Sequence, residues 1–208
     1  MASEVSRVGF EVHITCASDP STFTKVCKSL GVKPVHAHNI VGDLVVSTEL
    51  LSQATGFGSQ AEALATMHST ADRFREAGLV VVREKVELDP RHRGAPQRDH
   101  EAGAQYFEAH LRLSHAAGER HSVLELRDSL AGLGHTLWAS YNPLKRVEVG
   151  EEVTMLTARS HSMGLSSFRE HAEAAQAYCA QFFSMRPLIL EWAIADDNTA
   201  LDKVWMVS

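Results

Sequence analysis

A Glu-x-His pattern occurs twice in this chain, each time within a segment that alternates apolar and polar residues. The first segment runs from Phe10 to Cys16 and the second from Phe107 to Leu113. Alternation with a period of two predicts a strand with one buried face, so the polar residues share the opposite face. Imidazole and carboxylate groups held side by side can exchange protons, bind metal ions or hold a charged ligand. The polar face carries Glu11, His13 and Thr15 in the first segment and Glu108, His110 and Arg112 in the second.

The residues around these segments predict the same order of elements in both halves of the chain: strand, helix, strand, strand, helix and strand. Helix starts are indicated by capping boxes of the form Ser-x-x-Glu at Ser59, Ser122 and Ser167. Between the halves, residues 89–104 are polar and carry two prolines and two glycines, which is typical of a linker or a long surface loop. Two such halves with matched first strands predict an internal duplication.

This arrangement resembles a tandem ferredoxin-like fold, in which each βαββαβ lobe packs its helices on one face of an antiparallel sheet. The resemblance implies an α+β protein with one lobe at residues 1–90, a linker at 91–104 and a second lobe at 105–208. Each sheet face that the helices leave open needs cover, and the simplest cover is the other lobe. The two polar rows would then face each other across a cleft, where ligand sites are common. Neighbouring strands are expected to add Arg83, Lys85, Glu87, His36, His38 and Glu191 to that cleft.

One chemical hypothesis starts from His13-Ile14-Thr15, which resembles the His-hydrophobic-Thr/Ser motif of the two-histidine (2H) phosphoesterases. Those proteins have two duplicated lobes with one motif in each. The resemblance implies that His13 and His110 act as general acid and base and that Thr15 holds the phosphate. The second copy reads His110-Leu111-Arg112 and lacks the second hydroxyl, whose place a phosphate-binding guanidinium could take. Glu11 and Glu108 complete the catalytic set expected on this hypothesis.

A second hypothesis is a metal-dependent enzyme. Neutral imidazole and carboxylate groups on neighbouring strands suit Zn²⁺, Fe²⁺ or Mn²⁺. The ligands would be His13 with Glu87 and His110 with Glu191. On the other hypotheses no metal is expected, and the sequence indicates no particular cofactor.

The third hypothesis, which we favour, is a pocket for a small anionic molecule. Arg83, Lys85 and Arg112 would bind its phosphate or carboxylate, with Thr15, His36 and His38 as further contacts. The pattern leaves open whether such a pocket is catalytic. A structural role in a non-catalytic binding or interaction protein is the remaining alternative. In that case Glu11 would form a salt bridge with Arg83 or Lys85 across neighbouring strands.

Composition restricts the partners. The chain of 208 residues has a net charge of −6 and no long basic tract, so extended nucleic-acid binding is not expected. No apolar run approaches the roughly 18 residues of a membrane span, and the N-terminus lacks the segments of a secretory signal. Cys16, Cys27 and Cys179 lie in apolar patterns without a Cys-x-x-Cys pair, as expected for reduced, buried thiols in a cytoplasmic protein. The sequence indicates no particular oligomeric state.

Overall fold

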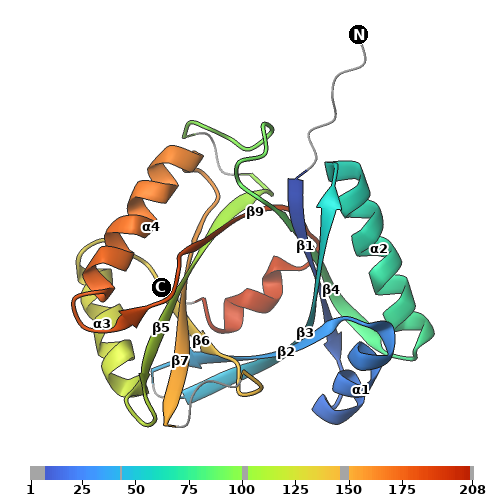
Figure 1. The fold of residues 1–208 in the computed structure, drawn as a ribbon, viewed down its shortest axis with the longest axis horizontal. Coiled ribbons are helices and arrows are strands. Elements are labelled where there is room, and N and C mark those ends of the chain that lie inside the picture. Colours follow the sequence, from blue (N-terminus) through green and yellow to red (C-terminus); the bar gives the residue numbers. More distant parts are fainter. Residues whose placement is uncertain (1–7, 43, 100–102, 146–149, 207–208) are drawn as a thin grey trace.

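The chain forms a closed antiparallel β-barrel with helices on its outside (Figure 1). The computed structural model describes residues 8–42, 44–99, 103–145 and 150–206. Eight strands pair around the barrel in the order β1, β3, β2, β6, β7, β5, β9 and β4, and β4 pairs with β1 to close the ring. Their bounds are β1 (Val8–Ala17), β2 (Lys33–Val41), β3 (Leu44–Gly58), β4 (Val80–Leu88), β5 (Tyr106–Ala116), β6 (Trp138–Tyr141), β7 (Glu151–Ser160) and β9 (Ile189–Asp196), with the short β8 (Ser184–Met185) beside β5.

The predicted α+β fold of tandem, internally duplicated ferredoxin-like lobes is therefore wrong. The expected order of strands and helices is present in each half, but the halves do not form two separate sheets. Instead β4 pairs with β9, and β2 pairs with β6, so the edge strands of one half join those of the other. A strand edge leaves backbone N–H and C=O groups unpaired, and closing a sheet into a barrel pairs them all.

The helices pack on the outer surface of the barrel in two groups. Figure 1 shows α1 (Pro20–Leu30) and α2 (Gln60–Glu76) on one side, and α3 (Arg120–Gly132) and α4 (Leu165–Cys179) on the other. The apolar faces of β1 and β5 point at these helices, as their alternation predicts. Phe23 and Phe74 stack on the first side, with ring centroids 6.0 Å apart. Phe107 and Phe168 do so on the second side at 5.8 Å.

The helix starts are only partly those expected from the sequence. Ser59 and Glu62 form the predicted capping box at the start of α2. Ser122 and Ser167 instead lie inside α3 and α4, so those two predicted boxes are wrong. The residue before α4 is Gly164, whose N–H donates to the carboxylate of Asp99 at 2.8 Å. A Cβ atom at this position would lie only 2.4 Å from the carbonyl carbon of Arg98, so the tight approach excludes a capping side chain.

The region between the two halves is a packed loop in its described part. The N–H of Leu165 donates to the carbonyl of Pro96 at 2.8 Å, which ties the loop to α4. The three cysteines are free and buried, as predicted. None of the helices in the described residues has the length and the hydrophobicity required to cross a membrane.

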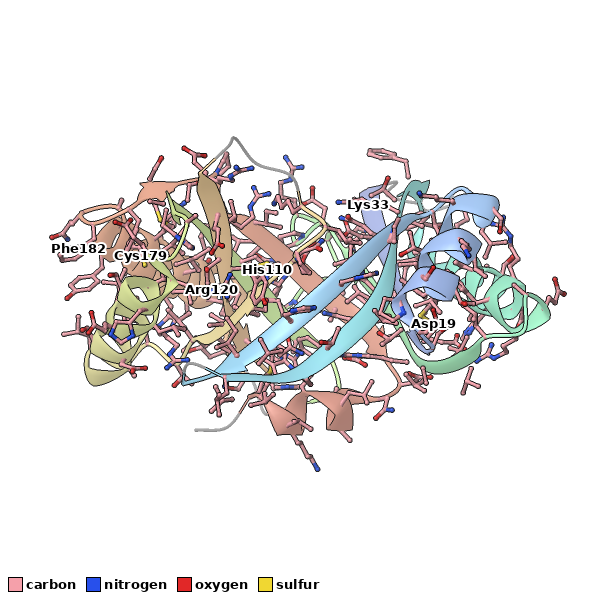
Figure 2. The ribbon with its side chains drawn as sticks, turned by 90° about the horizontal axis from the view of Figure 1, so that it is seen from below. Asp19, Lys33, His110, Arg120, Cys179 and Phe182 are labelled. Carbon is pink, nitrogen blue, oxygen red and sulfur yellow. The ribbon has the colours of Figure 1, made fainter. Side chains whose placement is uncertain are left out.

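A C-terminal 3₁₀ helix closes one end of the barrel. This helix, η1 (Thr199–Val204), lies behind the strands at the centre of Figure 1, in red. In Figure 2 it lies at the bottom, whereas Lys33 at the start of β2 lies at the top. Asp202 and Trp205 of this C-terminal segment are buried. The barrel interior is therefore floored by η1 and opens at the opposite end, which we call the mouth.

Candidate functional site

The barrel interior contains a cavity of about 620 Å³, within the range of sites for small molecules. It exists because the strand residues that point away from the helices are polar at many positions. These inward-facing residues come from both halves of the chain, so the two polar rows face one shared space, inside a barrel rather than between lobes. The predicted site residues that line it are Glu11, His13, Thr15, Arg83, Lys85, Glu87, Glu108, His110, Arg112 and Glu191.

Two predicted contacts, His36 and His38, do not line the cavity. The Nε2 atom of His36 lies 3.2 Å from the Thr24 hydroxyl on α1, on the helix side of the sheet. His38 Nδ1 lies 3.0 Å from the Tyr141 hydroxyl. The inward positions of β2 belong instead to the alternate residues Val35, Ala37 and Asn39.

His13 is held between two carboxylates. Its Nε2 atom lies 3.1 Å from Glu11 Oε1 and 3.1 Å from Glu87 Oε2, while Nδ1 lies 3.2 Å from the Ser52 carbonyl. Burial by itself lowers the pKa of His13, but hydrogen bonds to the two carboxylates and their charges outweigh burial and raise the pKa to about 10. His13 is therefore an imidazolium at neutral pH, with both ring nitrogens donating.

His110 has a similar environment, but with one close carboxylate instead of two. Its Nε2 atom lies 2.9 Å from Glu191 Oε2, and its Nδ1 atom lies 3.1 Å from the Thr157 hydroxyl. Burial opposes the charged form, but Glu191 overcomes it and raises the pKa of His110. Burial raises the pKa of Glu191, and the nearby charge of Glu87 adds to this, although His110 acts in the opposite direction.

A buried ion-pair network continues from these histidines toward the floor. Lys85 Nζ lies 2.6 Å from Glu87 Oε1 and 2.5 Å from Glu108 Oε2. Arg159 then bridges Glu108 and Asp202, each at 2.7 Å. Burial alone raises the pKa of Glu108, yet Lys85 and Arg159 hold it well below its usual value. Sequence reasoning missed Arg159, although the alternation of β7 places it on the same face as Met155 and Thr157.

The floor itself is an arginine between aspartates. Arg83 Nη1 lies 2.9 Å from Asp202 Oδ1, and Arg83 Nη2 lies 2.5 Å from Asp196 Oδ2. Asp196 also accepts a hydrogen bond from the Tyr106 hydroxyl. The sequence pattern gives no signal for Asp202, because it comes from a short irregular segment outside the strands.

The mouth carries three cations, Lys33, Arg112 and Lys145, that form no ion pair with any residue in the described part of the chain. Arg112 Nη2 donates to the Pro187 carbonyl at 3.1 Å, but its buried Nε has no hydrogen-bond partner there. Burial and the neighbouring Arg186 lower the pKa of Arg112. Burial, followed by Arg112 and Arg186, also lowers the pKa of Lys145. Apolar residues line the wall beside these cations: Val35, Leu51, Leu144, Val153, Met155 and Ile189.

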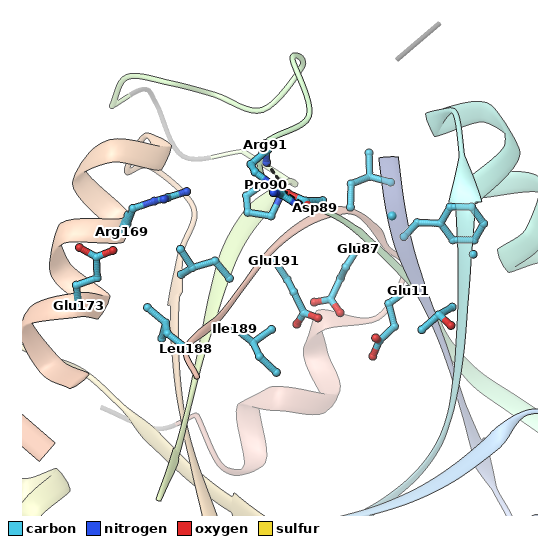
Figure 3. Close-up of a pocket in the computed structure, with 16 residues that line it drawn as sticks. Glu11, Glu87, Asp89, Pro90, Arg91, Arg169, Glu173, Leu188, Ile189 and Glu191 are labelled. Carbon is cyan, nitrogen blue, oxygen red and sulfur yellow. Dashed lines mark hydrogen bonds and ion pairs between the residues drawn. The ribbon is translucent and has the colours of Figure 1, made fainter. Parts of the chain in front are cut away.

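A second pocket of about 590 Å³ adjoins the first. The two share Glu11, Glu87, Ile189 and Glu191 as lining residues. Figure 3 shows the three carboxylates of this shared set extending into the same space, beneath the loop that carries Pro90. The glutamates therefore lie where the two pockets meet.

The arrangement does not provide a metal-binding cluster in the residues that the structure describes, because no group of three or more His, Cys, Asp or Glu side chains is placed to hold an ion. The proposed ligand pairs do meet, His13 with Glu87 and His110 with Glu191, but as hydrogen-bonded ion pairs. The ammonium group of Lys85, 2.6 Å from Glu87, already supplies a cation there. The metal hypothesis stays a prediction without a geometric argument in its favour.

No protein-family model and no curated protein matches the chain. The solved structures that match it include three with low TM-scores. A candidate monooxygenase from Fusobacterium nucleatum has a TM-score of 0.32 at 6% identity, covering 94% of this chain and 96% of that one. A candidate glycine cleavage system transcriptional repressor has a TM-score of 0.26 at 12% identity, with 88% and 97% covered. A candidate chlorite dismutase has a TM-score of 0.29 at 11% identity, with 96% and 98% covered. Such scores do not establish a shared fold, and no function follows from them.

Proposed function

We propose that this protein binds a small amphipathic anion, with a carboxylate or phosphate at the mouth of the barrel and an apolar body inside. The observation that carries the proposal is Arg112. Its guanidinium lines the cavity, has no carboxylate partner among the described residues, and keeps one buried donor without a hydrogen bond. A buried donor without a partner costs free energy, which a bound anion would recover.

The other cations of the cavity are unsuited to this task. Lys85 and Arg159 each contact two carboxylates at ion-pair distance, and Arg83 contacts three. An anion that approached them would have to displace those partners. Lys33 and Lys145, by contrast, join Arg112 at the mouth. Burial lowers the pKa of Lys145, and the positive charges of Arg112, Arg186 and Lys33 lower it further.

The apolar wall explains why the ligand should be amphipathic. Leu51, Val153, Met155 and Ile189 line the cavity next to the mouth cations. Burying an apolar chain against them contributes about 25 cal/mol for each Å² removed from water. An anion without such a body would bind through the mouth charges alone, and those are screened by salt.

Acid–base turnover is not part of the proposal. A general base needs a free nitrogen lone pair, and His13 is protonated at neutral pH because of Glu11 and Glu87. The resemblance to the two-histidine phosphoesterases stays a prediction, which hydrolysis of 2′,3′-cyclic nucleotides tests directly. The proposal also includes a reducing, cytoplasmic setting, in which three free thiols are stable.

The test is calorimetric titration with octanoate and octyl phosphate, with octan-1-ol as the uncharged comparison. We expect both anions to bind more tightly than the alcohol and Arg112→Ala to weaken anion binding about tenfold or more. Arg73→Ala is the matched control, because Arg73 Nη2 also donates to a backbone carbonyl, that of Leu30, but from α2 outside the barrel. Equal affinity for the anions and the alcohol, or an Arg112→Ala protein that binds octanoate as the wild type does, would contradict the proposal.

A further inference from the structure

Two neighbouring polar side chains on the cavity wall keep hydrogen-bonding capacity that no described residue uses. Ser140 on β6 and Asn39 on β2 both line the cavity and are only 3% and 1% exposed. They are paired residues of adjacent antiparallel strands, so their side chains lie next to each other on the inner face of the barrel. The pairing of β2 with β6 therefore fixes the position of the two side chains.

The contacts of Asn39 determine which of its groups is left over. Its Nδ2 atom donates to Ser47 Oγ at 3.1 Å and to Glu49 Oε1 at 2.7 Å, so both amide protons are used by β3. The oxygen Oδ1 accepts no hydrogen bond from any residue in the described part of the chain. This oxygen is not fully enclosed by protein, so it is open to the cavity that Asn39 lines.

The hydroxyl group of Ser140 is also open to the cavity and forms no hydrogen bond with another residue that the structure describes. Polar groups of residues buried to this degree normally have a partner. The oxygen of Asn39 can only accept a hydrogen bond, whereas the hydroxyl of Ser140 can donate or accept. A ligand group that satisfies both must donate to Asn39. A ligand hydroxyl does so while its own oxygen accepts from Ser140.

The strand register relates this pair to Arg112. Ser140 pairs with Met155 on β7, and Met155 pairs with Arg112 on β5. All three residues line the cavity, so they form one row across three adjacent strands, with the methionine between the two polar positions. Adjacent strands lie about 4.8 Å apart, so Ser140 and Arg112 are separated by about 10 Å along the wall.

We infer that the ligand is a hydroxy acid, whose hydroxyl group lies at the far end of its apolar body and binds Ser140 and Asn39. The inference rests on the proposed function, because that function places the acid group at Arg112. Met155 offers an apolar surface to the chain that connects the two groups. With about 10 Å between the two binding positions, a hydroxyl next to the acid group does not reach the pair. The ligand class is therefore an ω-hydroxy carboxylate or phosphate of medium chain length.

The inference is tested by comparing octanoate, 8-hydroxyoctanoate and 2-hydroxyoctanoate in the same calorimetric titration of the full chain. We expect 8-hydroxyoctanoate to bind about tenfold more tightly than octanoate, because its hydroxyl satisfies two buried polar groups. 2-Hydroxyoctanoate should show no such gain, because its hydroxyl lies beside the acid group. Ser140→Ala should reduce the gain about threefold or more. Ser129→Ala is the matched control and should leave the gain unchanged, since it removes an exposed hydroxyl on α3, outside the barrel.

The outcomes separate the two proposals. If octanoate binds and 8-hydroxyoctanoate binds equally well or more weakly, the hydroxyl site is ruled out and the anion pocket stands. An equal gain for 2-hydroxyoctanoate rules out the hydroxyl site as well. If none of the acids binds, the anion pocket fails and the inference fails with it.

Should Ser140→Ala not fold, 8-methoxyoctanoate gives a readout on the wild type. Methylation removes the proton that the ligand hydroxyl donates to Asn39, so 8-methoxyoctanoate must bind more weakly than 8-hydroxyoctanoate. Equal affinity of the two ligands would overturn the inference.

Discussion

Burial and charge compete at His13, and the outcome determines what the residue can do. An imidazole enclosed in a barrel would ordinarily lose its proton, because burial disfavours the charged form. Two carboxylates at 3.1 Å reverse that preference. His110, with one close carboxylate, follows the same rule. His13 is therefore a fixed positive charge within an ion network rather than a proton carrier, and the pKa of His110 is shifted in the same direction.

The raised pKa of His13 predicts a specific dependence of stability on pH. The folded-state pKa of about 10 lies above the ordinary value of 6.5, so proton uptake favours the folded state. This contribution is fully present below the unfolded value and is lost as the pH rises through about 10. We expect the wild type to lose on the order of a few kcal/mol of stability between neutral pH and pH of about 10, and His13→Gln to lose less. Denaturant unfolding measures the loss, and imidazole NMR shifts report protonation. A neutral His13 ring at mildly basic pH would contradict the prediction.

Lys85 gives a second residue-level prediction. It sits between Glu87 and Glu108 at 2.6 and 2.5 Å in the barrel interior. Replacing it by methionine keeps an unbranched side chain as far as Cε but removes the ammonium group, which leaves two buried carboxylates without that cation. We expect Lys85→Met to destabilise the fold by about 3 to 5 kcal/mol in chemical denaturation. The exposed Lys28→Met on α1 is the control. A Lys85→Met protein as stable as this control would show that the network is not needed.

The 3₁₀ helix η1 is attached to the barrel through the side chain of Asp202. Asp202 contacts Arg83 and Arg159, which otherwise keep Asp196 and Glu108 as partners. We expect Asp202→Asn to loosen the segment and to increase acrylamide quenching of tryptophan fluorescence, since Trp205 becomes exposed. Lys203→Gln, at an exposed position of the same helix, should leave quenching unchanged. Unaltered quenching in Asp202→Asn would mean that packing of Trp205 alone holds η1.

Local sequence patterns predicted the order of strands and helices, and they predicted which side chains of β1 and β5 share one face. Strand alternation placed Glu11, His13, Glu108 and His110 on one continuous inner surface, because side-chain direction is a local property of a strand. The histidines of β2 show the limit. His36 and His38 alternate with apolar residues as the polar face of a half-buried strand would, but the inward positions of β2 belong to the alternate residues.

Sidedness on β2 is set by its register against neighbouring strands, which the sequence of β2 alone does not encode. Helix starts have the same limit. The capping box at Ser59 forms, whereas Gly164 begins α4 because the chain passes very close to Arg98. Contacts from outside the element thus decide where it starts.

At the scale of the whole molecule, the sequence pattern did not predict that the strands close into a barrel. The β4–β9 seam pairs Val86 with Ala195, and the β2–β6 seam pairs Asn39 with Ser140. Each seam joins strands about a hundred residues apart, and no local signal specifies a lateral partner at that distance. The polar rows were nevertheless expected to share a space, because that expectation needs only two half-polar sheets and no knowledge of how their edges meet.

Closure predicts that the two halves of the chain unfold as one unit. All three tryptophans, Trp138, Trp192 and Trp205, lie in the second half, so their fluorescence reports that half, while far-UV circular dichroism reports the whole chain. Phe74 lies in the first half, is fully buried and stacks on Phe23. We expect Phe74→Ala to lower stability by about 3 to 5 kcal/mol and to shift the fluorescence and dichroism transitions together.

The two halves should unfold together because their strands pair with each other at the β4–β9 and β2–β6 seams. Losing the first half would expose the edges of β9 and β6, together with the carboxylates and cations that pair across the interior, so the second half has no stable state of its own. Val80→Ala, at a position that is 63% exposed on β4, is the control and should move neither transition. If Phe74→Ala shifts the dichroism transition while tryptophan fluorescence unfolds at the wild-type denaturant concentration, the halves are independent. The interior site would then have to form between separately stable parts, and a ligand in the barrel would be expected to bring the two transitions back together.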